Sequence, residues 1–217
     1  MKICAVILAI EDKCTLYHKD VALKLNKEYY NHFDIELRIM DKTFIDVNKM
    51  VTWNKTLLFE IYNDIDFVIA QDLDIIPCSK EFNIVDFLAL NEINLAVDST
   101  VFGESQYKNG VSFPHFRYNA GLTCYPKRYQ KIFKQIYDFG SDDPHSWGTG
   151  DQYYINEYLG KNNLFVNEIP QRFNTFFNPN INYNKLSFVH YTNYMGSHDK
   201  LSFIEKYHPK ELLNVHT

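Results

Sequence analysis

Short apolar runs alternate with stretches of helical periodicity along this chain. Residues 2–10 and 66–76 are apolar and rich in β-branched side chains, which predicts strands buried on both faces. Between them, Val21, Leu25 and Tyr29 recur at helical spacing and predict a helix. The same patterns predict further strands at 35–40, 94–98, 118–125, 163–170 and 186–191, and further helices at 52–62, 84–90, 129–139, 151–159 and 199–207.

The order of these elements predicts the fold class. Strands and helices alternate through the first half of the chain, which is typical of an α/β protein with a mostly parallel sheet and helices on both faces. The second half is less regular, and glycines and prolines predict a loop or hairpin at 101–115 and turns at 141–150. Since no repeat, low-complexity segment or linker interrupts the 217 residues, we expect one domain spanning residues 1–217.

Composition excludes several classes of protein. Hydrophobic residues are 46% and charged residues 23%, which suits a globular chain with a full core and excludes a disordered or fibrous one. The net charge of −5, without a basic block, argues against a nucleic-acid partner. No stretch approaches the roughly 20 apolar residues of a membrane span. The four cysteines are scattered, which favours a reducing compartment, so we expect a cytoplasmic protein.

The apolar run at 66–76 ends in two acids. Asp72 and Asp74 are two residues apart, and in an extended chain their side chains point to the same side. Carboxylates this close repel each other unless a cation or a proton lies between them. Because ligands of open α/β sheets bind beyond the carboxyl ends of the strands, the pair suits a divalent ion, Mn²⁺ or Mg²⁺ rather than zinc. A solvated strand end is the plainer alternative.

Two enzyme families carry a D-x-D motif after an apolar strand. In haloacid-dehalogenase-type phosphohydrolases the motif ends the first strand, and its first Asp is a nucleophile. In GT-A glycosyltransferases it follows two or three β-α units, as it does here, and holds the metal under a nucleotide-sugar diphosphate. This order favours the second family and leaves a D-x-D phosphohydrolase as the alternative enzyme. A catalytically silent nucleotide-sugar-binding module is the alternative outside the enzymes.

Further segments resemble GT-A transferases of the family 8 type, in the same order, over roughly residues 1–200. These segments are Trp53-Asn54-Lys55, Tyr118-Asn119-Ala120-Gly121-Leu122, Gly150-Asp151-Gln152, Pro170-Gln171-Arg172-Phe173-Asn174, and Val189-His190-Tyr191 with Gly196 and Lys200 behind it. The spacing from His190 to Gly196 is longer than the family's usual H-x-x-G. The resemblance implies a GT-A, Rossmann-like fold. It also implies metal-dependent transfer of a hexose from a nucleoside-diphosphate sugar, expected to be a UDP-sugar, to a glycan, glycoprotein or other hydroxyl acceptor.

The resemblance also implies binding residues. It gives Asp72, Asp74 and His190 as ligands of Mn²⁺ or Mg²⁺, with a hydrogen-bonded core histidine as the alternative role of His190. Lys55 and Lys200 would meet the diphosphate as point charges, and their alternative is a solvated surface lysine. The expected contacts with the nucleotide sugar are Ala9, Ile10, Lys55, Gln71, Asp72, Asn119, Ala120, Gly121, Gly196 and Lys200.

Asp151 and Gln152 are the predicted catalytic residues. Asp151 follows Gly150, so its plain role is the N-cap of a helix that starts at Gln152. The resemblance implies instead that this carboxylate faces the anomeric carbon, where an inverting enzyme uses it as a general base on the acceptor hydroxyl. A retaining enzyme would use a neighbouring group such as Gln152 on the opposite face. The sequence leaves the stereochemistry, the donor sugar and the acceptor open.

Overall fold

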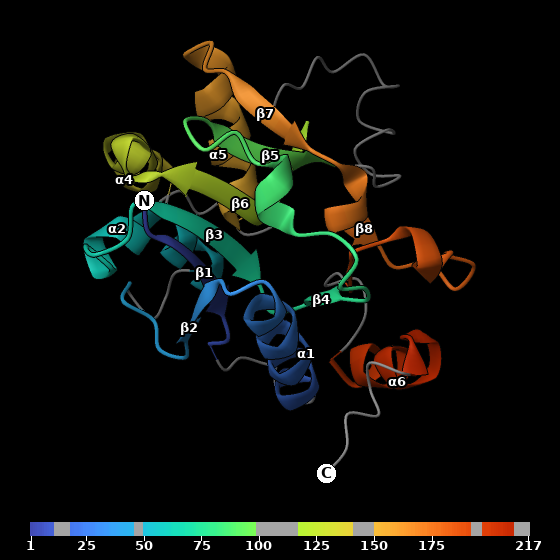
Figure 1. Ribbon diagram of the computed structural model, residues 1–217. Helices are drawn as coiled ribbons and strands as arrows, with labels where there is room; N and C mark the ends of the chain where they lie inside the picture. The colour runs from blue at the N-terminus through green and yellow to red at the C-terminus, as the bar shows by residue number, and fades with distance from the viewer. Residues whose placement is uncertain (11–17, 46–49, 99–116, 141–149, 192–196, 211–217) are drawn as a thin grey trace, which may run out of the picture.

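A computed structural model of the chain arranges helices on both faces of a central sheet (Figure 1). The structure describes residues 1–10, 18–45, 50–98, 117–140, 150–191 and 197–210. Its central sheet has the strand order β2-β1-β3-β6-β5-β7. These strands are β1 (Ile3–Leu8), β2 (Glu36–Met40), β3 (Phe67–Asp72), β5 (Ile93–Val97), β6 (Tyr118–Pro126) and β7 (Val166–Ile169).

A second, smaller sheet lies beside the first and has the order β4-β9-β8. Its strands are β4 (Ile75–Pro77), β8 (Thr175–Phe176) and β9 (Phe188–His190). The α-helices are α1 (Lys19–His32), α2 (Leu58–Ile61), α4 (Gln130–Gly140), α5 (Gly150–Lys161) and α6 (Ser197–Tyr207). Short 3₁₀ segments are η1 (Val51–Leu57), η2 (Ile84–Phe87), η4 (Lys127–Tyr129), η6 (Gln171–Phe173) and η7 (Tyr183–Lys185).

The directions of the strands agree with the predicted, mostly parallel sheet. β1 runs parallel to both β2 and β3, and β5 runs parallel to β7. β6 is antiparallel to both of its neighbours, β3 and β5. Its amino-terminal residues therefore lie beside the carboxyl end of β3, with Leu122 paired to Gln71. This reversal brings the start of β6 to the edge where a ligand of an open α/β sheet is expected.

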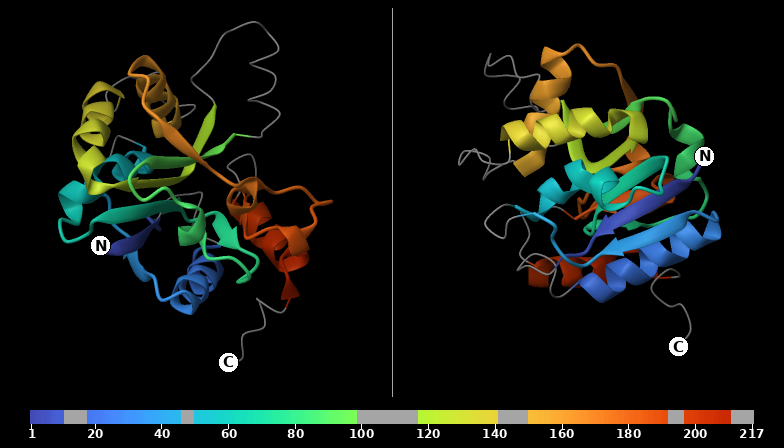
Figure 2. Two further views of the ribbon diagram at one scale, coloured as in Figure 1. Left: turned by 45° about the horizontal axis from the view of Figure 1, so that its top comes forward. Right: turned by 90° about the vertical axis from the view of Figure 1, so that its left-hand side faces the viewer.

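The apolar runs are continuous because both faces of the central sheet are covered. Alternate residues of β1 enter different hydrophobic clusters, Ala5 and Ile7 on the face of α1, and Cys4 and Val6 on the face of Trp53. Helices α4 and α5 pack on the same face as η1, and α1 lies on the other (Figure 2). A strand buried on both faces has no polar side to alternate with, which explains its sequence.

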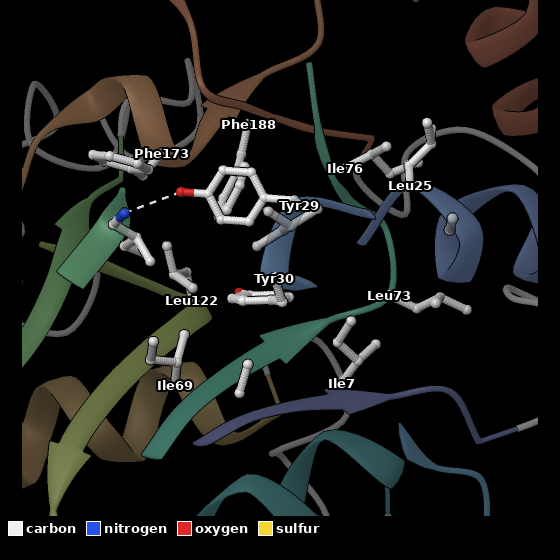
Figure 3. Packing of buried hydrophobic residues seen from close by; sticks show 14 of the residues in the cluster. Ile7, Leu25, Tyr29, Tyr30, Ile69, Leu73, Ile76, Leu122, Phe173 and Phe188 are labelled. Carbon is white, nitrogen blue, oxygen red and sulfur yellow. Dashed lines mark hydrogen bonds between the residues drawn. The ribbon is translucent and has the colours of Figure 1, made fainter. Parts of the chain in front are cut away.

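The face of α1 holds an aromatic core between the two sheets (Figure 3). The ring of Tyr29 packs edge-on against Phe188 of β9, with 4.7 Å between the ring centroids. Phe173 of η6 packs against the other edge of this cluster, 5.7 Å from the Phe188 ring. Edge-to-face pairs of this kind add roughly 0.5–1.5 kcal/mol each to the energy of burial. The small sheet is thereby fixed against the central one.

One predicted strand is two strands in the structure. The run at 66–76 divides into β3 and β4 at a turn formed by Leu73 and Asp74. The chain leaves the central sheet here because β4 pairs with β9 in the second sheet. The Gln71 amide stabilises the turn by donating to the carbonyl oxygen of Ile75 over 2.7 Å. The expectation that the two acids share one side of an extended strand is therefore wrong.

Two predicted helices are tighter and shorter than their periodicity indicates. The segment 52–62 begins as the 3₁₀ segment η1 and is α-helical only over Leu58–Ile61. The segment 84–90 contains only η2. Asn83 caps this segment, since its side chain accepts a hydrogen bond from the Val85 amide over 3.0 Å. A 3₁₀ turn and an α-helical turn bury similar spacings of apolar residues, so the pattern does not separate them. The predicted loops at 101–115 and 141–149 lie outside the described residues.

None of the described helices combines the length and the apolarity that crossing a lipid bilayer requires.

Candidate active site

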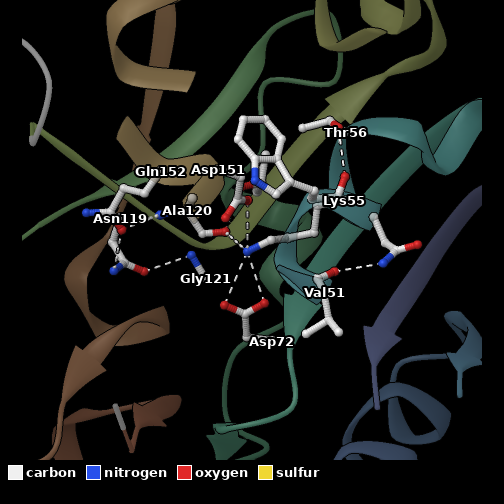
Figure 4. Close-up of polar contacts among 12 residues, drawn as sticks. Val51, Lys55, Thr56, Asp72, Asn119, Ala120, Gly121, Asp151 and Gln152 are labelled. Atoms are coloured by element: carbon white, nitrogen blue, oxygen red, sulfur yellow. Dashed lines mark hydrogen bonds and ion pairs between the residues drawn. The ribbon is translucent and has the colours of Figure 1, made fainter. Parts of the chain in front are cut away.

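The polar residues named by the sequence gather at one edge of the central sheet, where β3 ends and β6 begins. Lys55 of η1 is central to this site, and its side chain is only 1% exposed. Its Nζ donates to the carbonyl oxygen of Ala120 over 2.8 Å and lies 3.0 Å from Oδ1 of Asp72 and 3.3 Å from Oδ2 of Asp151 (Figure 4). Asp72 and the Ala120 carbonyl accept hydrogen bonds from this ammonium group, and Asp151 is its second ion-pair partner. Lys55 thus joins η1, β3, β6 and α5.

Negative charge is in excess around this lysine. Burial in itself lowers the pKa of Lys55, but the carboxylates of Asp151 and Asp72 outweigh it and leave that pKa raised. The pKa of Asp72 is raised to about 6, because its burial and the charges of Asp74 and Asp151 outweigh the attraction of Lys55. Burial also raises the pKa of Asp151. One ammonium group therefore does not balance the carboxylates, and a further cation would stabilise them.

Asp74 has a different set of partners on the second sheet. Lys200 of α6 donates from Nζ to Oδ2 of Asp74 over 2.8 Å, and Nε2 of His190 lies 3.4 Å from Oδ1. Burial opposes ionisation of this carboxyl group, but His190 and Lys200 together hold its pKa below the usual range. His190 comes to this position because Ile75, the next residue after Asp74, pairs with it across β4 and β9.

A chain of side-chain amides leads away from His190. Its Nδ1 lies 2.9 Å from Oδ1 of Asn174, and Nδ2 of Asn174 donates to Oδ1 of Asn119 over 2.9 Å. Nδ2 of Asn119 donates to Oε1 of Gln152 over 3.0 Å, and Nε2 of Gln152 donates to Oδ2 of Asp98 over 2.9 Å. This row of hydrogen-bonded side chains crosses the site from the end of β5 to β9.

The structure separates the predicted metal ligands into two groups. Asp74 and His190 face each other, whereas the carboxylate of Asp72 is directed at Lys55. Within the described ranges, no three His, Cys, Asp or Glu side chains converge in a group able to hold a metal ion. The three-ligand set of Asp72, Asp74 and His190 therefore stays a prediction that needs the Asp72 carboxylate to turn from Lys55.

The other predicted contacts fall at this edge with differing exposure. Ala9 and Ile10 follow β1 and are 0% and 7% exposed. Gln71 is fully buried on the face of α1, where its amide donates to Asn26 and accepts from the hydroxyl of Tyr30. Its contact with a nucleotide sugar stays a prediction, although these bonds hold its amide inside the fold. The predicted contact Gly196 lies outside the described residues.

Asp151 does not have the N-cap role that was the alternative to a catalytic one. Helix α5 already includes Gly150, so Asp151 lies in the first turn and is not its N-cap. Its carboxylate is 4% exposed and directed at Lys55, as the close-up of the site also illustrates (Figure 4). Gly150 precedes it with a φ of 51°, a conformation that favours glycine.

Sequence reasoning missed two residues of the site. Asn174 is fully buried and contacts both His190 and Asn119. It stands in the segment Pro170–Asn174 that carries the family resemblance, so a signal was present without a role attached to it. Asp98 contacts Gln152, and the signal that could have found it is an acid directly after β5.

A substitution of Gly121 is expected to disturb this site directly. A Cβ atom at Gly121 would lie 2.8 Å from Cε1 of His190 and 2.9 Å from Oδ1 of Asn119, closer than such atoms approach. We expect Gly121→Ala to lower the free energy of unfolding by about 1–3 kcal/mol and to weaken any response of the melting temperature to Mn²⁺.

The matched control is Gly140→Ala, whose Cβ would lie 2.5 Å from the Trp53 ring on the opposite face of the sheet. It should destabilise the protein similarly while leaving the Mn²⁺ response intact. Equal Mn²⁺ responses in the two variants would contradict the assignment of the His190 region as a ligand site.

Comparison with known proteins gives a result for the fold. No protein-family model matches this chain, and no curated protein matches it in sequence. Among solved structures, it is similar to the crystal structure of a glycosyltransferase involved in the glycosylation of the major capsid of PBCV-1. The match covers 94% of this chain and 100% of that chain, with a TM-score of 0.70 and 13% sequence identity. The chain has the fold of this glycosyltransferase. At this identity the likeness concerns the fold, and it confirms the predicted Rossmann-like α/β class.

Proposed function

We propose that this protein is a glycosyltransferase that moves a hexose from a nucleoside-diphosphate sugar, a UDP-sugar in the first instance, to a hydroxyl group of a glycan or glycoprotein acceptor. One observation carries the proposal. In a fold shared with a glycosyltransferase, Asp74 and His190 face each other just beyond the carboxyl edge of β3, which ends at Asp72. This is the edge where open α/β sheets bind their ligands.

Asp74 and His190 are placed to share a divalent cation such as Mn²⁺ or Mg²⁺, and Asp72 would join them by turning from Lys55. Oδ1 of Asp74 and Nε2 of His190 lie 3.4 Å apart, and the raised pKa of Asp72, which comes from burial and neighbouring carboxylates, reflects surplus negative charge nearby. Carboxylate oxygens with one imidazole suit Mn²⁺. Asp72, Asp74 and His190 would hold the cation, which when bound supplies a Lewis acid for the leaving diphosphate.

The two buried lysines of the site have different proposed roles. Lys200 neutralises Asp74 in the protein alone, over 2.8 Å, and would have to leave this carboxylate to contact a diphosphate. Lys55 is held by the Ala120 carbonyl and Asp151 as well as by Asp72, so its proposed role is to stay in place and keep Asp151 oriented when Asp72 turns to a cation. A bound divalent cation would take over the neutralisation of Asp74 from Lys200.

Asn119, Ala120, Gly121 and Gln152 form the proposed sugar side of the site. Oε1 of Gln152 accepts hydrogen bonds from the Ala120 amide over 3.1 Å and from Asn119 over 3.0 Å. Its Nε2 donates to Asp98, which leaves one N–H of the amide for a ligand. Gln152 is thereby rigidly oriented, as a group next to a reacting centre needs to be.

Asp151→Asn tests whether this carboxylate is a base or a counter-ion. Because the side chain is 4% exposed and 3.3 Å from Lys55, we expect it to act as a counter-ion. Transfer should then fall by less than about 10-fold, against the roughly 10²–10⁴-fold loss expected on removing a general base. Initial rates at saturating donor are the measurement. A loss in the larger range, with donor affinity unchanged, would restore Asp151 as the base.

The proposed function is tested by thermal shift and by turnover. UDP with Mn²⁺ at about 100 times the dissociation constant should raise the melting temperature by roughly 5–10 °C, and EDTA should remove this shift. A screen of UDP-hexoses with hydroxyl acceptors should then release UDP. Phosphate release from simple phosphomonoesters without a nucleotide would replace the proposal with a phosphohydrolase. Tight UDP binding without turnover of any donor would replace it with a silent binding module.

A further inference from the structure

We propose that Asn174 is a positioning residue that keeps the proton of His190 on Nδ1, so that Nε2 presents its lone pair to a cation shared with Asp74. The inference rests on the proposed function only for the identity of the reaction that uses this cation. It concerns the chain of amides that runs from Asp98 through Gln152, Asn119 and Asn174 to His190.

The orientation of each side-chain amide in this network is fixed. The oxygen and nitrogen of a side-chain amide are exchangeable by a flip unless a neighbour of fixed polarity decides between them. Backbone N–H groups can only donate. The Gly121 amide donates to Asn119 over 2.9 Å and the Ala120 amide donates to Gln152 over 3.1 Å, so an oxygen of each side chain must face these groups.

The same polarity extends through Asn174 to His190. Since Asn119 presents its oxygen, the atom of Asn174 that lies 2.9 Å away must be the nitrogen, Nδ2. Asn174 therefore turns its oxygen to Nδ1 of His190, also at 2.9 Å. An amide oxygen only accepts, so Nδ1 must carry a hydrogen. At the other end of the network, the carboxylate of Asp98 accepts a hydrogen bond from Nε2 of Gln152. This contact fixes the Gln152 amide in the same orientation.

The hydrogen on Nδ1 of His190 determines the state of Nε2. In a neutral ring with hydrogen on Nδ1, the lone pair is on Nε2, which faces Oδ1 of Asp74 at 3.4 Å. Two acceptors that face each other at this distance share a cation. That cation is either a proton on Nε2, in which state His190 lowers the pKa of Asp74, or a divalent ion in place of the proton. The ring cannot turn away, because it stacks on Phe176 with 5.0 Å between the centroids and Gly121 lies against Cε1. Outer hydrogen bonds of this kind orient metal-binding histidines generally.

The first measurement is the tautomer of His190 in the metal-free protein, read at pH 8 from ring nitrogen shifts of ¹⁵N-histidine-labelled material. The spectrum of His190→Ala assigns the signals. The expected result is hydrogen on Nδ1 and none on Nε2. Hydrogen on Nε2, in the other tautomer or in a doubly protonated ring, overturns the proposal. This measurement on the unaltered chain does not depend on the folding of any variant or on transferase activity.

The second measurement uses Asn174→Leu, which has a similar volume and no acceptor. His190 should then move its hydrogen to Nε2, where Asp74 can accept it. The dissociation constant of Mn²⁺ alone, followed by electron paramagnetic resonance of free Mn²⁺, should rise roughly 10–100-fold. An unchanged dissociation constant in a folded Asn174→Leu protein overturns the positioning role.

The matched control is Asn94→Leu. Asn94 is also a fully buried asparagine, and its Nδ2 donates to the carbonyl oxygens of Ala89 and Glu92 near the start of β5, away from the site. Its loss should lower stability without changing the His190 tautomer or Mn²⁺ binding. If no nucleotide sugar is turned over and yet His190 and Mn²⁺ behave as expected, the proposed function fails and the inference stands.

Discussion

Replacing Lys55 with methionine is expected to lower the free energy of unfolding by about 3–5 kcal/mol, the range for removing one partner of a buried ion pair. Methionine keeps the length of the side chain and removes the ammonium group. Asp72 and Asp151 would then lie near each other with no cation, and the carbonyl oxygen of Ala120 would lose its donor. Chemical denaturation of both proteins in EDTA measures the difference.

The control for Lys55 is a lysine whose ion pair is at the surface. Lys80 lies 3.4 Å from Glu28 with 33% of its side chain exposed, so Lys80→Met should cost less than about 1 kcal/mol. The double variant Lys55→Met with Asp151→Asn should recover part of the loss, because it removes one of the stranded carboxylates. A cost below about 1 kcal/mol for Lys55→Met would mean that the lysine does not hold the site together.

Asp74→Asn is expected to abolish the Mn²⁺-dependent stabilisation by UDP and to lower transfer by at least about 10³-fold, the loss of several kcal/mol of charge stabilisation in the transition state. The amide keeps the shape of the side chain but is a poor ligand for a hard cation. The fold should persist, because the backbone of Asp74 accepts a hydrogen bond from Tyr191 over 2.8 Å in either form.

A second effect of Asp74→Asn must be separated from the first. Lys200 is 1% exposed and pairs with Asp74, so neutralising the acid also removes a carboxylate that faces this buried ammonium group. The double variant Asp74→Asn with Lys200→Met removes both charges. It should recover stability while the Mn²⁺ response stays absent. Asp86→Asn, an exposed acid on η2, is the control for a change of net charge. A Mn²⁺ response in Asp74→Asn equal to that of the unaltered protein would remove Asp74 from the proposed cation site.

Much of the site could be predicted because its residues stand in short motifs. The order of the elements predicts where the strands of the sheet end. That edge holds Asp72, Asp74, His190 and Asn119. The motifs did not predict which charged side chains form ion pairs with each other. Lys55 and Lys200 were expected to face a diphosphate, and in the protein alone each is bound to an acid. The partner of a buried charge is decided by which side chains the fold brings within 3–4 Å, and no local pattern encodes that.

The sequence by itself determined the elements with strong local signals. The run that forms β1 is apolar throughout because helices cover both faces of the sheet, and the helical spacing of Val21, Leu25 and Tyr29 marks α1. Such patterns are local, since burial of a strand or of one helix face requires a fixed spacing of apolar residues whatever the partner is.

Only the tertiary structure decided the turn at Leu73 and Asp74 and the geometry that depends on it. Residues 66–76 are apolar enough for one long strand, but β4 pairs with β9, which lies more than a hundred residues later in the chain. That pairing bends the chain, separates Asp72 from Asp74, and sets His190 opposite Asp74. Hydrogen bonds to a distant strand outweigh the local preference for extension, because the backbone groups of a buried segment must find partners wherever the fold supplies them.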